Sequence, residues 1–175
     1  MSEGEVAVPR LGMIRAAKGF GLVAAMNPFD AVGTARISGA VYDRVCRVAM
    51  AYQSADEERD IVMRAIKDAD GAPAVEWVTK AVHAVRATRK HQDLRIGSSV
   101  RGAIDAALVA ASLAKVRSTS VADGRVGLDA ALVALSGRVR VREGSTRTSD
   151  EVIEEIWTSV FAEADAKKVT APAGA

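Results

Sequence analysis

An asparagine that ends a short apolar run is the polar residue of this sequence best placed to do chemistry. Residues 22–26 have no polar interruption, and Asn27 and Pro28 stop the run abruptly. The length and composition of the run predict a strand buried on both faces of a parallel sheet. Ligands of open α/β sheets bind beyond the carboxyl ends of the strands, where Asn27 would contact a ligand or a water. The alternative role for Asn27 is to cap a turn.

The other residue types that carry chemistry form no catalytic or metal-binding pattern. His83 and His91 each lack a second histidine or a cysteine at ligand spacing, which argues against a metal site. Cys46 lies in an apolar run, so burial as a small hydrophobic side chain is favoured over a reactive thiol. Arginines alternate with valines at residues 138–142 without interleaved aromatic residues. A solvent-exposed face is therefore favoured there over a nucleic-acid stripe.

Short extended segments and turn residues dominate the first part of the chain. Residues 5–8 and 13–16 flank the sequence Pro-Arg-Leu-Gly, which predicts a hairpin. Residues 41–47 predict a helical turn that leads into a second strand at residues 48–52. The elements that would position Asn27 are therefore a hairpin and two strands.

The remainder of the sequence is predicted to be helical. Ser54 and Glu57 have the spacing of a capping box, and so do Thr148 and Glu151. A break after Asp70 predicts a domain boundary, with one domain at residues 1–70 and a helical domain at residues 71–163. Four amphipathic helices form the second domain, and residues 164–175 are predicted to be a disordered tail. The apolar stripes of these helices include Val75, Val78, Val82 and Val85; Val100, Ile104, Ala107, Leu108 and Ala111; Leu128, Ala131, Leu132 and Leu135; and Val152, Ile153, Ile156, Trp157 and Val160.

Length and composition limit the class of protein. The 175 residues suit one domain, or one small domain with an appendage. The formal net charge is +2, with Lys and Arg scattered among Asp and Glu, so neither disorder nor a nucleic-acid partner is indicated. A single cysteine fits a reducing compartment. Neither a membrane-spanning stretch nor a signal peptide is found, so the sequence predicts a cytoplasmic protein without a membrane partner.

Several segments, taken in order, resemble the MoxR branch of the AAA+ ATPases. They read VAAMNPFD, VGTARISGAVYDRVCRVAMAY, SADEERDIV, RIGSSVRGAIDAAL and ALSGRVRVREG. The similarity runs from about Glu5 to Trp157, and it depends on the order and spacing of the segments because each motif is short. The resemblance implies the carboxyl-terminal part of an α/β P-loop NTPase (AAA+) core followed by an all-α helical lid. Such a chain would be predominantly helical.

The resemblance assigns roles to individual residues. Asn27 would be sensor 1, which helps to position the attacking water. Arg44 would be the arginine finger that reaches the nucleotide of a neighbouring subunit, with Arg47 as the runner-up. Arg101, at the start of a helix, would be sensor 2 and would contact the γ-phosphate of ATP. The alternatives are that Arg44 forms an ordinary surface pair with Asp43 and that Arg101 is a solvated helix-start residue.

Two motifs of the family are missing from the sequence. No glycine is followed by Lys-Ser or Lys-Thr, so there is no Walker A loop, and no acidic Walker B strand precedes Asn27. The chain is therefore expected to be the later part of an ATPase, beginning after its catalytic half. In the family's 5-1-4-3-2 sheet, residues 22–26 would be strand four and residues 48–52 strand five, without the strand between them.

For the complete enzyme, the resemblance implies bound ATP and Mg²⁺ and a homo-oligomer, commonly a hexameric ring. It also implies a client protein that is remodelled or matured, and some family members work beside a von Willebrand A-domain protein. This chain alone is expected to be inactive as an ATPase and to bind no cofactor tightly. The alternative is a non-enzymatic helical interaction module that docks on an intact AAA+ paralogue.

Overall fold

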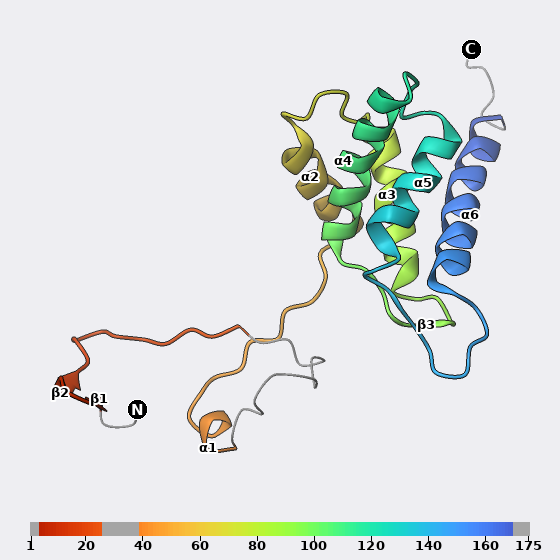
Figure 1. The fold of residues 1–175 in the computed structure, drawn as a ribbon. Coiled ribbons are helices and arrows are strands. Elements are labelled where there is room, and N and C mark those ends of the chain that lie inside the picture. Colours follow the sequence, from red (N-terminus) through yellow and green to blue (C-terminus); the bar gives the residue numbers. More distant parts are fainter. Residues whose placement is uncertain (1–3, 26–38, 170–175) are drawn as a thin grey trace, which may run out of the picture. The chain divides into compact units, whose positions relative to one another are not determined.

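The computed structural model describes residues 4–25 and 39–169 and divides the chain into two compact units. The first unit is Met1–Met50 and the second is Ala51–Ala175. Helices make up most of the regular structure, and the described residues form only two small antiparallel sheets (Figure 1). The boundary between the units lies between Met50 and Ala51. The sequence instead predicts a domain boundary at residue 70.

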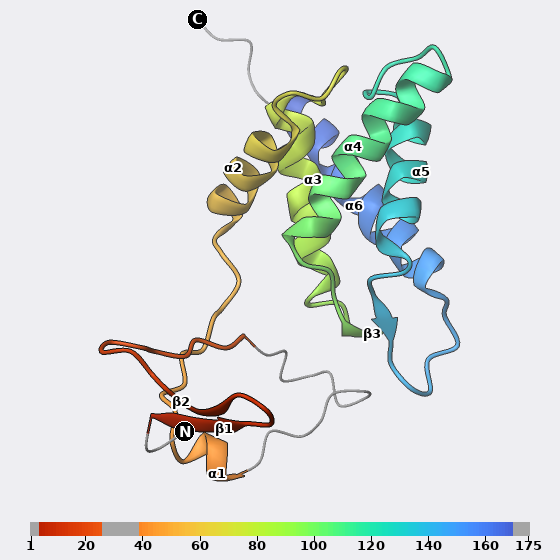
Figure 2. The same cartoon turned by 60° about the vertical axis from the view of Figure 1, so that its left-hand side comes forward.

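The first unit contains the predicted hairpin. β1 (Glu5–Val8) pairs antiparallel with β2 (Gly12–Arg15), and Figure 2 shows the two strands side by side. Left-handed backbone at Arg10 and Gly12, with φ of 70° and 81°, turns the chain between them. α1 (Gly39–Tyr42) is a short helix of 4 residues within the segment that joins the hairpin to the second unit.

The strands predicted at residues 22–26 and 48–52, the first of them as a buried strand, are wrong for every residue that the structure describes there. Val23 is 98% exposed and Met50 is 87% exposed, so neither segment lies between packed layers. A parallel strand needs neighbours for its backbone N–H and C=O groups, and the described part of the chain supplies none. The described residues consequently contain no parallel sheet. Met26, the last residue of the first predicted strand, lies outside them.

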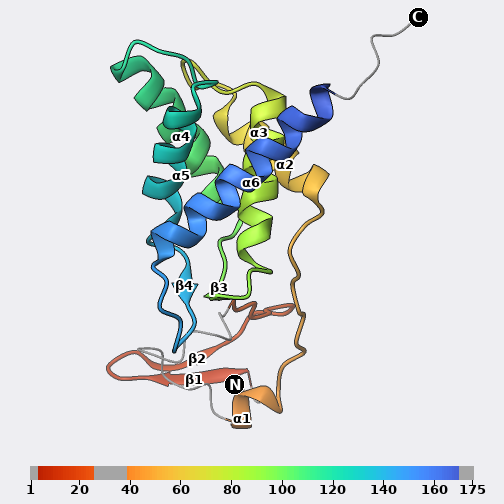
Figure 3. The ribbon, with the colours of Figure 1, turned by 90° about the vertical axis from the view of Figure 1, so that its right-hand side faces the viewer.

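The second unit is a bundle of helices with one small sheet, and the four helices predicted after residue 74 are all present. Its elements are α2 (Ala55–Ile66), α3 (Val75–Thr88), β3 (Leu94–Ile96), α4 (Val100–Val116), α5 (Gly124–Leu135), β4 (Arg140–Val141) and α6 (Ser149–Val169). α2 packs against α3 and α4, α4 packs along α5, and α6 packs against α3 and α5. Figure 3 shows α6 crossing obliquely in front of α5 and α3. The β3–β4 pair joins the loop before α4 to the chain that follows α5.

The buried faces of α4 and α5, two helices that pack along each other, consist mainly of alanine. Leu108, which the sequence places on the buried stripe of α4, is 37% exposed, and Ile104 is only partly buried. Small side chains let two helix backbones approach closely, and α5 offers a matching alanine face, so the helices pack through these faces instead. The buried alanines are Ala103, Ala106, Ala107, Ala110, Ala111 and Ala114 of α4 and Ala130, Ala131 and Ala134 of α5.

Three aromatic side chains join α6 to α3. Trp157 is 3% exposed and stacks on Phe161 with 4.4 Å between ring centroids. Trp77 of α3 lies 5.6 Å from Trp157 by the same measure. Gly127 of α5 gives the indole room, because a Cβ at that position would lie 3.3 Å from it. Trp157 therefore lies against both of the helices on which α6 packs.

Both capping boxes predicted from the sequence are confirmed. The Ser54 side chain accepts from the Glu57 N–H at 3.3 Å, and the Glu57 carboxylate accepts from the Ser54 N–H at 2.8 Å. Thr148 and Glu151 make the same reciprocal pair at the start of α6, at 3.3 and 2.7 Å. Such boxes satisfy backbone donors that a helix leaves without acceptors, so the helix starts are fixed by local sequence.

α6 extends further than the sequence predicts. It ends at Val169, whereas the predicted tail begins at residue 164, and residues 170–175 lie outside the described chain. Neither α6 nor any other helix in the described residues is both long and apolar enough to cross a membrane.

We expect Trp157→Ala to lower the free energy of unfolding by about 3–5 kcal/mol, because it removes a buried aromatic side chain that contacts two other helices. Val116→Ala is the control: Val116 is 82% exposed on α4, and the expected change is within about 0.5 kcal/mol. Urea denaturation followed by far-ultraviolet circular dichroism measures both variants. Equal destabilisation by the two substitutions would contradict the packing described for α6.

Candidate anion site at the start of α4

α4 begins with positive charge, and its first turn contains no acidic residue. Its N-cap residue Ser99 makes no side-chain hydrogen bond to the first turn, and that turn contains no acidic residue. The first amides of a helix have no acceptor within the helix, and the helix dipole adds about half a positive charge there. Arg101, the second residue of α4, is exposed and adds a full charge. Such a helix start favours an anion.

The other helices of the bundle begin with acidic residues. α2 has three in its first turn, α3 has Glu76, and α6 has Asp150 and Glu151. At α5 the N-cap residue is Asp123, whose carboxylate accepts from the Arg125 N–H at 2.9 Å. Arg125 therefore occupies the same helical position as Arg101, but behind an acidic cap. This pair of arginines provides a matched comparison within one chain.

Hydrogen bonds fix the turn that precedes α4 to the end of α3. The Ser98 N–H donates to Thr88 Oγ1 at 2.9 Å, and the Thr88 hydroxyl donates to the Val85 carbonyl at 2.6 Å. Arg89 Nε–H donates to the Ser98 carbonyl at 2.7 Å. Thr88 and Ser98 are buried, where an unpaired polar group costs about 1–3 kcal/mol. The turn is therefore held in one position on α3.

Two glycines let this turn approach its neighbours. A Cβ on Gly97 would lie 2.6 Å from the backbone N and Cα of Arg89. A Cβ on Gly102 would lie 2.6 Å from Leu135 Cδ2 and would also collide with the Ser98 hydroxyl. Both distances are well inside van der Waals contact. Close approach, rather than an unusual backbone angle, requires glycine at these two positions.

A buried carboxylate joins the same turn to the chain that enters α2. Glu58 is 1% exposed and pairs with Arg89 Nη1 at 2.8 Å and with Arg86 Nη1 at 3.0 Å. Arg86 also donates to the Gln53 carbonyl at 2.8 Å, and the Tyr52 ring lies 3.9 Å from the Arg89 guanidinium carbon. Burial of a carboxylate is tolerated only when it is paired, and here two arginines pair with it.

A second polar cluster holds the loop between α3 and α4 to α6. Arg147 Nη1 lies 2.5 Å from Glu155 and 3.3 Å from Asp93. His91 Nδ1 accepts from the Asp93 N–H at 3.2 Å, and its Nε2 lies 3.5 Å from Glu155. The hydrogen bond from Arg147, and then that from His91, hold the pKa of the Glu155 carboxyl below its usual value of 4.5. His91 lies in the loop between α3 and β3, and the sequence gives no sign of these partners.

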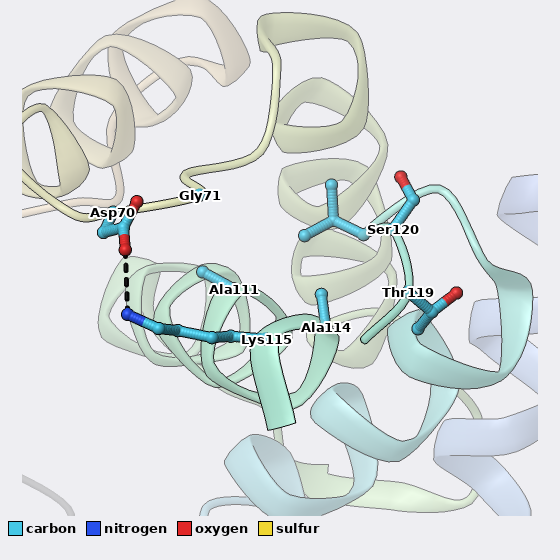
Figure 4. A pocket seen from close by; sticks show the side chains of 8 residues that line it. Asp70, Gly71, Ala111, Ala114, Lys115, Thr119 and Ser120 are labelled. Atoms are coloured by element: carbon cyan, nitrogen blue, oxygen red, sulfur yellow. Dashed lines mark hydrogen bonds and ion pairs between the residues drawn. The ribbon is translucent and has the colours of Figure 1, made fainter. Parts of the chain in front are cut away.

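Two open hollows on the bundle are formed by other residues. One, of about 390 Å³, is bordered by Asp70 and Lys115, which form an ion pair of 2.9 Å (Figure 4). The other, of about 490 Å³, lies between α4 and α5 beside the ion pair of Asp105 and Arg138. The charged groups at each hollow pair with one another, so neither presents free charge to a ligand. Arg101 lines neither of them.

The predicted site residues fall in different parts of the chain. Asn27 lies outside the described residues. Arg44 and Arg47 are exposed residues of the first unit, and the Arg44 N–H donates to the Val41 carbonyl just after α1. Arg101 belongs to the second unit. Of the predicted site residues, Arg101 is the one whose role can be argued from the packing and hydrogen bonds around it.

Sequence reasoning missed the side chains that hold the start of α4. The sequence position of Glu58 indicates a helix-start acid that complements the helix dipole. Glu58 instead lies on the buried face of α2, four residues before Val62 and eight before Ile66. That spacing is the signal that marks Glu58 as buried. Arg89 carries no such signal, because its partner Ser98 lies across a loop.

Comparisons of the chain with protein-family models, with curated proteins and with solved structures find no match. The interpretation of the site therefore depends on its geometry and on the motifs quoted from the sequence. The sequence predicts Arg101 at the start of a helix, and the structure places it in the first turn of α4.

Gly102→Ala is expected to lower the free energy of unfolding by about 1–3 kcal/mol, because the new Cβ would collide with Ser98 and Leu135. Gly124→Ala is the matched control at a helix start, where nothing lies within 4 Å of the new Cβ. Alanine favours helices over glycine, so the control is expected to gain up to about 1 kcal/mol. Chemical denaturation measures both variants, and a gain for Gly102→Ala would contradict the close packing of this turn.

Arg147→Gln is expected to reduce the dependence of stability on acid pH. The pKa of Glu155 is lower in the folded than in the unfolded protein, so its stabilising contribution is present above the unfolded value of about 4.5 and is lost as pH falls through the folded value. Removing Arg147 removes the first cause of that shift. Urea midpoints measured between roughly pH 6 and pH 3 report the difference. Parallel curves for wild type and Arg147→Gln, with Arg125→Gln as the control, would contradict it.

Proposed function

We propose that this chain is a portion of a MoxR-type AAA+ ATPase, which couples ATP binding and hydrolysis at subunit interfaces to the remodelling or maturation of a client protein. The observation that carries the proposal is Arg101, exposed in the first turn of a helix whose start has no acidic residue in the described chain. The helical bundle would be the lid, and Arg101 its sensor 2 residue. The preceding residues would belong to the α/β P-loop core.

The geometry at α4 supports a phosphate as the anion. The amides of the first turn would donate hydrogen bonds to a phosphate oxygen, and the Arg101 guanidinium would add charge-assisted bonds. Thr88 and Arg89 hold the turn before α4 on the end of α3. A phosphate bound by Arg101 would therefore be connected to the whole bundle rather than to one flexible side chain. A lid that responds to nucleotide state needs this connection.

The described residues fit only part of the requirement for nucleotide hydrolysis. ATP supplies the phosphate groups, and Arg101 fits their terminal end. The described chain brings together no group of three or more His, Cys, Asp and Glu side chains that could hold a metal ion, so Mg²⁺ would be held by other residues of a complete enzyme. Asn27 would orient the attacking water, and Arg44, or Arg47 in its place, would reach the neighbouring subunit. The chain alone would not be an efficient ATPase.

The partners follow from the same proposal. The complete enzyme would act as a homo-oligomer, with a hexameric ring as the expected form, because the arginine finger acts on the nucleotide of a neighbouring subunit. It would act on a client protein, in some cases beside a von Willebrand A-domain protein. Neither a nucleic acid nor a membrane is proposed as a partner.

A chimera tests the assignment of Arg101. Residues 5–163 would replace the corresponding part of an intact MoxR-type ATPase, and hydrolysis would be measured as kcat and KM. We expect an active chimera in which Arg101→Ala lowers kcat by about 10²-fold, because a charged donor to the phosphate is lost. Arg125→Ala, at the same helical position of α5, is expected to retain full activity. Equal activity of the two variants, or an inactive chimera that is folded and assembled, would contradict the proposal.

A second candidate function is favoured by the exposed apolar side chains before the bundle. Val23, Val48 and Met50 are at least 80% exposed, and Phe20 and Tyr52 are 68% and 60% exposed. Large apolar side chains left exposed in this number indicate a surface that a partner covers. The chain would then be a non-enzymatic helical interaction module that docks on an intact AAA+ paralogue and donates Arg44 to its neighbour.

Mixing this chain with an intact MoxR-like ATPase tests the second candidate. The module is expected to stimulate hydrolysis, and Arg44→Ala is expected to abolish the stimulation while leaving binding intact. Arg10→Ala, an arginine of the hairpin turn, serves as the control. The absence of any effect on turnover at every mixing ratio would count against the module.

A further inference from the structure

We infer that Arg89 is a positioning residue, through which the chain segment that enters α2 sets the turn that carries Arg101. The inference gives Arg101 a form of regulation and so rests on its proposed role. Its structural part, the coupling of Tyr52 to the start of α4, requires no nucleotide. The two parts can therefore fail separately.

One guanidinium is the meeting point of three segments. Arg89 Nε donates to the Ser98 carbonyl at 2.7 Å, and Nη1 lies 2.8 Å from the buried Glu58 carboxylate. The Tyr52 ring lies over the guanidinium, 3.9 Å from its central carbon. A guanidinium is planar and rigid, so its edges cannot move independently. Displacement at the Tyr52 face is therefore transmitted to the bond with Ser98.

Arg89 connects two segments that each lie next to the start of a helix, α2 at one end and α4 at the other. Tyr52 lies in the segment just before the helix cap at Ser54, and Arg86 holds the adjacent Gln53 carbonyl at 2.8 Å. At the other end, Ser98 directly precedes Ser99, the N-cap residue of α4. Arg89 therefore provides a polar connection between the entry of α2 and the turn before α4, beside the direct packing of α2 on α4. The segment before Tyr52 is also the one that contains the finger candidates.

The cluster is not fully satisfied in the observed arrangement. Arg89 Nη2 and Glu58 Oε1 are buried and have no hydrogen-bond partner among the described residues, although Oε1 lies 2.8 Å from Nη1 as an ion pair. A shift of the guanidinium that brings Nη2 onto Oε1 would satisfy both atoms and weaken the bond to Ser98. Coupling between sites requires an element with two arrangements, and these two unsatisfied atoms are the observation that points to a second one for the Arg89 guanidinium.

Tyr52 is the position at which coupling can be tested without breaking the buried ion pair. Removing Glu58 alone would leave the buried Arg89 guanidinium without its carboxylate, and removing Arg89 alone would leave Glu58 with one of its two arginines. Either change would destabilise the protein for a purely structural reason. Tyr52 is 60% exposed, so its substitution is expected to leave the thermal midpoint unchanged. Tyr52→Leu removes the aromatic face, and Tyr52→Phe keeps it.

Amide ¹H–¹⁵N spectra of the full chain provide the test. Tyr52→Leu is expected to shift the resonances of Ser99, Val100 and Arg101, and Tyr52→Phe is expected to restore the wild-type positions. In an Arg89→Gln/Glu58→Gln background, which removes both buried charges together, Tyr52→Leu is expected to leave these resonances where they are. Arg89→Lys provides a second background that keeps the charge but loses the planar fork.

Two results would overturn the inference. One is that the shifts caused by Tyr52→Leu stay within residues 50–58 and α3 and do not reach the start of α4. The other is that the shifts at Ser99 and Val100 are the same whether or not Arg89 is present. Neither result would bear on the ATPase chimera, where loss of kcat in Arg101→Ala is measured independently. Conversely, an unaffected Arg101→Ala chimera would leave the coupling itself intact.

Discussion

The position of Arg101 depends on the contact between the turn before α4 and the end of α3. Gly97 and Gly102 allow that contact, and buried hydrogen bonds from Ser98 and Arg89 hold it. The alanine faces of α4 and α5 then keep the two helices close, and the indole of Trp157 packs on Gly127 of α5 and brings in α6. A short polar turn is therefore built into the packing of the whole bundle.

The two units differ in how completely they bury their own apolar side chains. The helical unit buries a continuous core, whereas the described part of Met1–Met50 leaves large side chains such as Val23 and Met50 in solvent. Under the proposed function, these exposed side chains would be covered by other parts of a complete enzyme. The bundle needs no such completion, and its candidate site is formed from its own residues.

Local features could be predicted from the sequence, and features that depend on distant partners could not. The helix starts at Ser54 and Thr148 were readable because a capping box involves residues three apart. The strands at residues 22–26 and 48–52 were not, because a buried strand depends on neighbours that an apolar run does not reveal. Arg101 could be placed at a helix start, but the pairing of Glu58 with arginines on another helix could not be foreseen.

The most direct test of the account is a titration of the full chain with pyrophosphate, followed by the amide resonances at two helix starts. The account predicts saturable shifts at Val100 and Arg101, their loss in Arg101→Ala, and no shift at Gly124 and Arg125, where Asp123 caps the helix. Equal shifts at the starts of α4 and α5, or no shift at α4, would contradict the claim that α4 begins with a built phosphate site.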